Sequence, residues 1–305
     1  MQHPFYGLLR WAKACVSQIF VRALLSAFGF LWLFVEIIDY FWNNLSPLVR
    51  QHDVWFLALG LVYAGWRCKP RERVSGRLAG RDVVIEIAVG NIYRFPGALV
   101  VGSNTTFDTQ VSPQLISEES IQGQFTRRYY SNSQELDIAI ARGLEELPFQ
   151  ELPGKRIGKA KRYDVGTVVK VMPKGRTGYF TAIADINEHG NASSDVERIR
   201  VALTKLWLFI GERGGRDPIL MPVLGTGFSR VNVTREQIIR ETIQSFVAAC
   251  AEKVFCENLT VVISPRDAER HSIDLEKLGS YLAHVCEYTE VSSSSSIGVG
   301  TGIDG

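Results

Sequence analysis

The sequence predicts a layered α/β domain preceded by a transmembrane helical hairpin. Two observations support this fold class. The first 66 residues contain two apolar segments separated by a short polar loop. From Asp82 onward, short apolar runs alternate with amphipathic stretches, which is typical of layered α/β domains. We therefore expect one soluble domain besides the hairpin in the 305 residues.

The first apolar segment, Ile19–Ile38, is about as long as a helix needs to cross a hydrocarbon core of roughly 30 Å. Its two charges, Arg22 and Glu36, lie near its ends, where long side chains reach the headgroups. We therefore predict a transmembrane helix at 19–38. A signal peptide is the rival interpretation, but the run is long for one and no Ala-x-Ala cleavage site follows it.

The second apolar segment, Val54–Trp66, is shorter than a comfortable span and taken alone fits a buried core helix equally well. Aromatic residues near the ends of both segments favour membrane interfaces, and residues 43–53 form a plausible hairpin turn. We therefore predict a second transmembrane helix at 54–66, which gives a membrane region at 1–68. A simple anchor is the plainer alternative to any pore.

Basic residues cluster before the first segment and after the second, so both termini are expected in the cytoplasm. These residues also account for the formal charge of +2, and they indicate membrane lipid rather than nucleic acid as a partner. The five cysteines include no C-x-x-C pair, so we expect neither a disulfide framework nor a zinc site. We also expect no metal and no cofactor elsewhere in the chain.

The rest of the chain divides into a basic linker at 69–81, a folded domain at 82–288 and a disordered Ser/Gly-rich tail at 289–305. The apolar runs predict six strands, at Val83–Val89, Ala98–Gly102, Thr167–Met172, Tyr179–Ile186, Ile219–Val223 and Leu259–Ser264. Apolar stripes predict four helices, at about 136–147, 196–210, 235–250 and 274–285. Capping boxes at Ser194 with Glu197 and at Thr234 with Gln237 predict where the second and third helices begin.

Two strand ends carry small and hydroxyl residues, at 102–108 and 224–230. Ligands bind at such strand ends in open α/β sheets. In the second loop, Gly225 and Gly227 permit close approach of the backbone, and the N–H groups around Thr226 are suited to an anion. Glycines also serve simple tight turns, so a Gly-x-Gly loop alone leaves a tight turn and a phosphate site as alternatives.

Three further residues extend this candidate site. Arg230 offers a cation, and Phe228 is placed to cover a ribose or base. Asp185, at the end of the Tyr179 strand, points to the same sheet edge, although a turn before His189 explains it equally well. The sequence therefore predicts a phosphate-containing ligand at the carboxyl ends of the strands.

The ordered motifs GNI at 90–92, ALVVGSN at 98–104 and LGTGF at 224–228 resemble those of macro domains, which bind ADP-ribose. More specifically, VVGSNTTFDT, SIQGQF, ALTKLW and PVLGTGFSR, together with the two membrane helices, resemble the macro-type ThsA effectors of type II Thoeris antiphage defence. This resemblance implies a three-layer macro-like domain, in which a mixed sheet lies between helices.

The resemblance also implies a function in the bacterial inner membrane. The ligand would be an NAD-derived signalling nucleotide, histidine-linked ADP-ribose, made by a partner TIR-domain protein. Binding would drive homo-oligomerisation and membrane disruption, which stops the infected cell. Matched by position, Asn91 and Ile92 would lie near the adenine, Ser103 and Asn104 near the distal ribose, and residues 225–228 around the diphosphate.

The sequence departs from hydrolytic macro domains after Asn104, where TTFDT replaces the Gly-rich stretch and its acidic residue. Many macro domains also have Asp where this chain has Asn91. We therefore expect a ligand-gated effector rather than an enzyme. The alternatives are a membrane-tethered ADP-ribosyl hydrolase, in which Asn104 or Asp108 positions a water, and an anchored module with a vestigial pocket and a protein partner.

Overall fold

A computed structural model of the chain describes residues 18–42, 53–67, 71–112, 115–155, 157–186, 192–193, 195–225 and 233–288. These residues belong to two compact units, which divide after Arg71. The loop predicted between the two apolar segments, at 43–52, and the tail predicted to be disordered, at 289–305, lie outside the described residues.

The first unit contains two helices, α2 (Gln18–Trp42) and α4 (Asp53–Arg67). Within the described part of the chain, one helical stretch, Phe20–Phe41 of α2, is long and apolar enough to cross a membrane. With 15 residues, α4 is roughly 22 Å long, less than the thickness of a hydrocarbon core. The second membrane span therefore stays a prediction.

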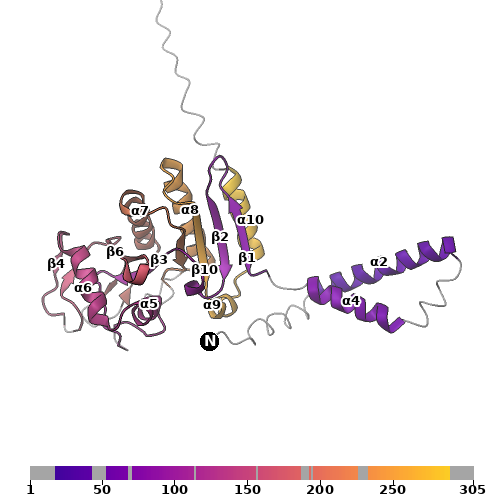
Figure 1. Cartoon of the computed structure of the whole chain (residues 1–305), viewed down its shortest axis with the longest axis horizontal. Coiled ribbons are helices and arrows are strands. Elements are labelled where there is room, and N and C mark those ends of the chain that lie inside the picture. Colours follow the sequence, from indigo (N-terminus) through magenta and orange to yellow (C-terminus); the bar gives the residue numbers. More distant parts are fainter. Residues whose placement is uncertain are drawn as a thin grey trace, which may run out of the picture. The chain divides into compact units, whose positions relative to one another are not determined.

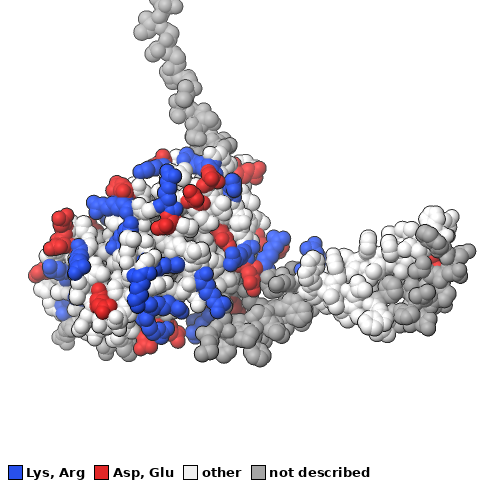
Figure 2. Space-filling model, in the orientation of Figure 1, with Lys and Arg blue, Asp and Glu red and all other residues white. Residues whose placement is uncertain are grey.

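The two helices approach closely at Gly60, where an added Cβ would lie 3.2 Å from the Phe28 ring. Large apolar side chains point outward, and Trp32 and Tyr40 are 72% and 83% exposed. Figure 2 shows that the side chains of α2 and α4 visible in that view are mainly uncharged. An apolar outer surface of this kind is rare in water-soluble proteins and fits contact with lipid.

The second unit is built on a mixed sheet with the strand order β1-β2-β10-β9-β3-β7-β6, in which β8 also pairs with β7 (Figure 1). Its strands are β1 (Arg73–Arg77), β2 (Val84–Val89), β3 (Ala98–Asn104), β6 (Val168–Val171), β7 (Gly178–Ile186), β8 (Ala192–Ser193), β9 (Ile219–Pro222) and β10 (Asn258–Ile263). The five strands β2, β10, β9, β3 and β7 are parallel, whereas β1, β6 and β8 run antiparallel to their neighbours. All six predicted strands are therefore present.

Helices cover both faces of this sheet (Figure 1). One face packs on α7 (Val196–Arg213), α8 (Arg235–Glu252) and α10 (Leu275–Tyr288), and the other on α5 (Ile121–Tyr129) and α6 (Ser133–Leu144). The shorter elements are α9 (Pro265–Arg270), η1 (Ile92–Arg94), η2 (Pro173–Gly175) and a separate hairpin of β4 (Gln150–Glu151) and β5 (Lys161–Arg162). Along β3, Val100 faces the α7–α8–α10 side, while Leu99 and Val101 face the α5–α6 side. Burial on both faces explains why the central strands are continuously apolar.

The predicted linker at 69–81 is wrong in one respect, because it contains β1. This edge strand pairs antiparallel with β2 and places exposed Arg73 and Arg77 on its outer side. Val74 packs on α10, whose Gly279 permits the close approach: an added Cβ would lie 3.1 Å from Val74 Cγ1. The second unit therefore begins at Glu72 rather than Asp82.

The helix predicted to begin at 196 does so, but its predicted capping residue, Ser194, is wrong. The residue that caps α7 is Asp195, whose Oδ1 accepts from the Arg198 N–H at 2.8 Å. A carboxylate serves this position well because it also interacts favourably with the helix dipole. The start predicted for α8 is confirmed, since Thr234 Oγ1 accepts from the Gln237 N–H at 3.2 Å.

Candidate functional site

The five parallel strands end at one edge of the sheet, and the residues at these ends form the candidate site. We call the set Asn91, Ser103, Asn104, Asp185 and Gly225 the strand-end site. Asn91 follows β2, which β10 and β9 separate from β3. With neighbouring strands about 4.8 Å apart, Asn91 and Ser103 are therefore roughly 14 Å apart across the sheet. Gly225, which comes shortly after β9, lies between them along this edge.

The predicted adenine residues have local structural roles. The Asn91 side chain caps η1, because its Oδ1 accepts from the Tyr93 N–H at 3.0 Å. Ile92 is 5% exposed and packs in the core on the α5–α6 side. Asn91 thus uses its oxygen locally, which leaves its Nδ2 group as the donor for a ligand.

Ser103 is the least satisfied polar residue of the site. Its side chain is 4% exposed, and its Oγ has no hydrogen-bond partner among the described residues. Strand β3 continues through Asn104, two residues beyond the prediction, and its pairing with β7 shifts register between Ser103 and Asn104. A buried hydroxyl without a partner is costly unless something else supplies one.

The Asn104 side chain is held by the loop that follows it. Its Oδ1 accepts from the Asp108 N–H at 3.0 Å and lies 3.1 Å from Thr106 Oγ1, while its Nδ2 donates to Asp108 Oδ2 at 3.1 Å. The amide oxygen is therefore occupied. One of the two Nδ2 protons remains for another acceptor.

Asp108 is buried, with 1% of its side chain exposed, and pairs with Lys155 Nζ at 3.2 Å. Further donors to this carboxylate are Thr106 Oγ1 at 2.6 Å and the Lys159 N–H at 2.6 Å. Such a carboxylate is not placed to activate a water. These contacts indicate that Asp108 holds the loop after β3, whereas the hydrolase alternative would have it position a water.

Asp185 is 16% exposed at its side chain and lies between two arginines. Its carboxylate accepts from Arg162 and from Thr105 Oγ1, and Arg198 Nη1 lies 3.6 Å away. The carboxylate therefore ties β7 to β5, to α7 and to the loop after β3. Arg162 was not singled out by sequence analysis, because its contact with Asp185 depends on the fold.

Gly225 has a φ of +69°, the left-handed conformation that glycine adopts without strain. The remaining predicted ligand residues, Thr226, Gly227, Phe228 and Arg230, lie outside the described residues. Arg235, at the start of α8, lies beside this turn, and its Nη1 donates to Gly225 O at 3.3 Å. The sequence did not lead us to expect this cation. Its signal in the sequence is an arginine at the first position of the helix that follows the glycine loop.

Burial lowers the pKa of the Arg235 guanidinium, while nearby Asp267 opposes the shift. The group stays protonated at neutral pH because an arginine begins from a very high pKa. A partly dehydrated cation gains more from an anionic partner than one fully in water does. Arg235 is therefore suited to an anion bound near Gly225.

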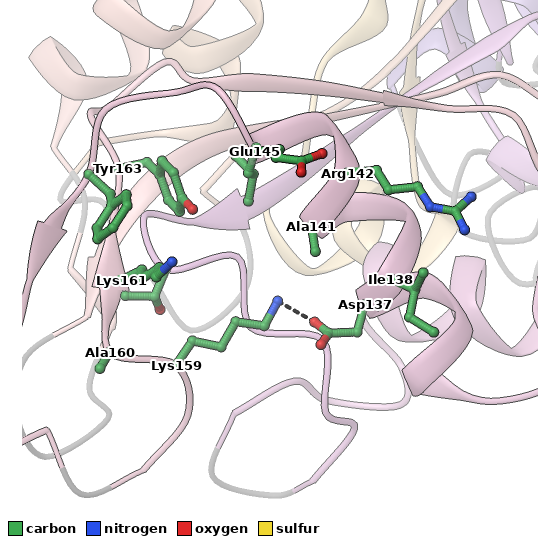
Figure 3. Close-up of a pocket in the computed structure, with 12 residues that line it drawn as sticks. Asp137, Ile138, Ala141, Arg142, Glu145, Lys159, Ala160, Lys161 and Tyr163 are labelled. Atoms are coloured by element: carbon green, nitrogen blue, oxygen red, sulfur yellow. Dashed lines mark ion pairs between the residues drawn. The ribbon is translucent and has the colours of Figure 1, made fainter.

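A separate cavity of about 720 Å³ lies between α6 and the β4–β5 hairpin (Figure 3). Phe149 and Tyr163 line it with their rings 6.1 Å apart, and Lys161 Nζ lies 4.2 Å from the Phe149 ring centroid. Lys159 pairs with Asp137 at the other side of the cavity, as the dashed line in Figure 3 shows. Both lysines are thus engaged within the cavity itself.

The thiols of the second unit are unreactive. Burial raises the pKa of Cys250 and of Cys256 to about 12, so both are protonated at neutral pH. The part of the chain that the structure describes also contains no group of three or more His, Cys, Asp or Glu side chains that could hold a metal ion. The strand-end site, with its hydroxyl and amide groups and with the Arg235 guanidinium beside Gly225, therefore remains the candidate.

Comparisons with known proteins agree with this architecture. The family model described as the macro domain of the Thoeris protein ThsA matches residues 85–264. A curated relative, the Thoeris protein ThsA of Bacillus amyloliquefaciens (strain Y2), is 29% identical over 152 residues, which are 48% of this chain. The chain spans about half the length of that relative, since the match covers 50% of it.

Two solved macrodomains show more distant similarity. The Oceanobacillus iheyensis macrodomain with ADP has a TM-score of 0.47 and 14% identity, over 69% of this chain and 100% of that one. The Trypanosoma brucei macrodomain in complex with ADP-ribose has a TM-score of 0.43 and 10% identity, over 64% of this chain and 72% of that one.

Proposed function

Because the chain belongs to the ThsA macro-domain family of Thoeris proteins, we propose that its strand-end site binds an NAD-derived ADP-ribose conjugate. The ligand is of the histidine–ADP-ribose class, made by a partner TIR-domain protein. The protein acts as a membrane-anchored effector of bacterial antiphage defence. Ligand binding drives its oligomerisation, and the oligomer disrupts the inner membrane.

The observation that carries the ligand class is the order of groups along the sheet edge. The Asn91 amide lies at one end, the Ser103 hydroxyl lies roughly 14 Å away, and Gly225 with Arg235 lies between them. A base, a diphosphate and a distal ribose follow one another in the same order in ADP-ribose. The left-handed turn at Gly225 and the guanidinium beside it suit the anionic middle of such a ligand.

The membrane role is supported by α2, whose stretch Phe20–Phe41 is long and apolar enough to cross a bilayer. In this proposal α4 forms the second span and both termini are cytoplasmic. Its 15 residues make a marginal span, whose depth in the bilayer responds to assembly of the oligomer. Binding in the second unit is thereby coupled to the first.

We propose an effector without catalytic turnover because the polar side chains of the loop after β3 are already engaged with one another. Asp108 is buried and paired with Lys155, and the Asn104 oxygen is occupied. A membrane-tethered ADP-ribosyl hydrolase is the alternative. Incubation of the protein with an ADP-ribosylated peptide tests that alternative, and release of free ADP-ribose would support it over the effector.

Titration calorimetry of the full chain in detergent, with ADP-ribose and with histidine–ADP-ribose, tests the proposed ligand. We expect saturable binding, tighter for the conjugate. A second measurement follows the oligomeric state by analytical ultracentrifugation and dye release from vesicles, both with and without the conjugate. Absence of binding refutes the ligand, whereas binding without assembly or dye release refutes the effector role.

A further inference from the structure

The loop after β3, residues 105–109, is held by contacts with the segment between β4 and β5. We call the contacts of Lys155 and Lys159 with Thr106 and Asp108 the clamp. The Lys155 ammonium and the Asp108 carboxylate form an ion pair in which each side chain is only 1% exposed. Lys155 Nζ also donates to Thr106 Oγ1 and to Lys159 O, both at 2.8 Å. All three ammonium protons therefore have partners, as a buried cation requires.

The backbone of the loop is strained, which indicates that the clamp fixes its conformation. Phe107 has a φ of +49°, which is unfavourable for a bulky side chain, and it is fully buried. Gly158, with a φ of +81°, lies so close that an added Cβ would be 2.4 Å from Asp108 Oδ1. The two segments thus fit together only with glycine at this position.

The clamp reaches the strand-end site through shared hydrogen bonds. Thr106 Oγ1, which accepts from Lys155, lies 2.6 Å from Asp108 Oδ2 and 3.1 Å from Asn104 Oδ1. Asp108 in turn holds both the oxygen and the nitrogen of the Asn104 amide. The orientation of that amide therefore depends on Lys155, whose own atoms take no part in the edge of the sheet.

We propose that Lys155 is a positioning residue that gives the strand-end site its preference for a ligand with a distal ribose. Through Asp108 and Thr106 it aims the remaining Asn104 Nδ2 proton at the ribose. This inference rests on the proposed function, because it assigns that end of the site to the ribose. Loss of the clamp loosens the ribose end and leaves the Asn91 and Gly225 ends unchanged.

The test compares two ligands on the full chain in detergent. Calorimetry measures affinity for ADP-ribose and for ADP, which lacks the distal ribose, in the wild type and in Lys155→Met. We expect the variant to bind ADP-ribose roughly tenfold more weakly, the value of about one good hydrogen bond, and to bind ADP as the wild type does. Lys161→Met, on the same hairpin but with its ammonium over Phe149, is the matched control and keeps both affinities.

Removal of one partner from a buried ion pair often unfolds a protein, so a second variant is needed. The double variant Asp108→Asn/Lys155→Met leaves no unpaired charge. We expect it to melt near the wild-type temperature while it still loses affinity for ADP-ribose selectively, because Thr106 and Asn104 are no longer anchored. Gly158→Ala, which displaces Asp108 without removal of any charge, should show the same selective loss.

Two results overturn the positioning role alone. The variants lose both ligands equally if Lys155 only stabilises the fold, and they lose neither if the loop is held by other contacts. If the wild type binds neither ADP-ribose nor ADP, the proposed function is itself wrong and the positioning role is refuted with it. The wild-type titration therefore separates failure of the function from failure of the clamp.

Discussion

The Ser103 hydroxyl is buried at the carboxyl end of β3 with no partner among the described residues. Thr181, on the neighbouring strand β7, has the same property, but it lies in the middle of its strand opposite Gly102. Both hydroxyls cost stability in this state. They differ in position, because Ser103 is the next-to-last residue of β3 whereas Thr181 is fully buried and five residues before the end of β7. We therefore expect a ligand at the sheet edge to contact Ser103 rather than Thr181.

We predict that Ser103→Ala acts in opposite directions on stability and binding. Removal of an unsatisfied hydroxyl should stabilise the protein by up to about 1 kcal/mol, while loss of a ligand contact should weaken ADP-ribose binding about fivefold. Thermal melting and calorimetry measure the two effects. The control Thr181→Val should stabilise the protein without any change in affinity, and an equal loss of affinity in both variants contradicts the assignment.

At the scale of single elements, α7 and α8 are joined by a bidentate ion pair. Arg200 Nε and Nη2 donate to the two Glu241 oxygens at 2.8 and 2.7 Å. The hydrogen bonds from Arg200 hold the pKa of Glu241 below its usual value. A depressed carboxylate pKa means that folding favours the ionised form, so this pair stabilises the fold only where Glu241 is ionised.

Glu241→Gln should therefore lower the free energy of unfolding by less than about 1 kcal/mol at neutral pH, since the Arg200 side chain is half exposed to water. The difference from the wild type should persist above the unfolded carboxyl pKa of about 4.3 and vanish as the pH falls through the lower folded value. Urea unfolding at neutral and acidic pH measures it. A difference that grows on acidification contradicts this account.

At the scale of the whole molecule, the chain joins an apolar helical unit to an α/β unit that has its own core. The two differ in surface as well as in fold. Figure 2 shows Lys and Arg side chains gathered where Figure 1 labels α5, whereas the visible surface of α2 and α4 is mainly uncharged. The helical unit is therefore suited to lipid, and the α/β unit to water.

This separation predicts that Leu33→Glu removes membrane association and leaves ADP-ribose affinity unchanged. Leu33 is 58% exposed within the apolar stretch of α2, where a carboxylate costs about 3 kcal/mol on insertion. Membrane fractionation and calorimetry test the two halves of the prediction. Tyr40→Glu, near the end of the helix, is the control and should retain association, because a charge there reaches the headgroups.

Much of the central sheet was predictable because its strands are buried on both faces and so are continuously apolar. Strand β9 (Ile219–Pro222) and strand β10 (Asn258–Ile263) illustrate this, each within one residue of its predicted ends. Strand β1 was not predicted because it is not continuously apolar. Its alternate residues are exposed, and backbone pairing with β2, rather than its own side chains, makes it a strand.

The candidate site likewise has features that were predictable from the sequence and contacts that were not. Local composition and periodicity were enough to predict the apolar helix α2, the positions of the central strands and the small polar residues at their ends. Three contacts became visible in the folded structure: Asp108 pairs with Lys155, Arg235 lies beside Gly225, and Asp185 lies between Arg162 and Arg198. Each of these contacts joins different helices, strands or loops, 10 residues apart for Arg235 with Gly225 and 47 for Lys155 with Asp108. Local composition and periodicity do not record which of these groups the fold brings together.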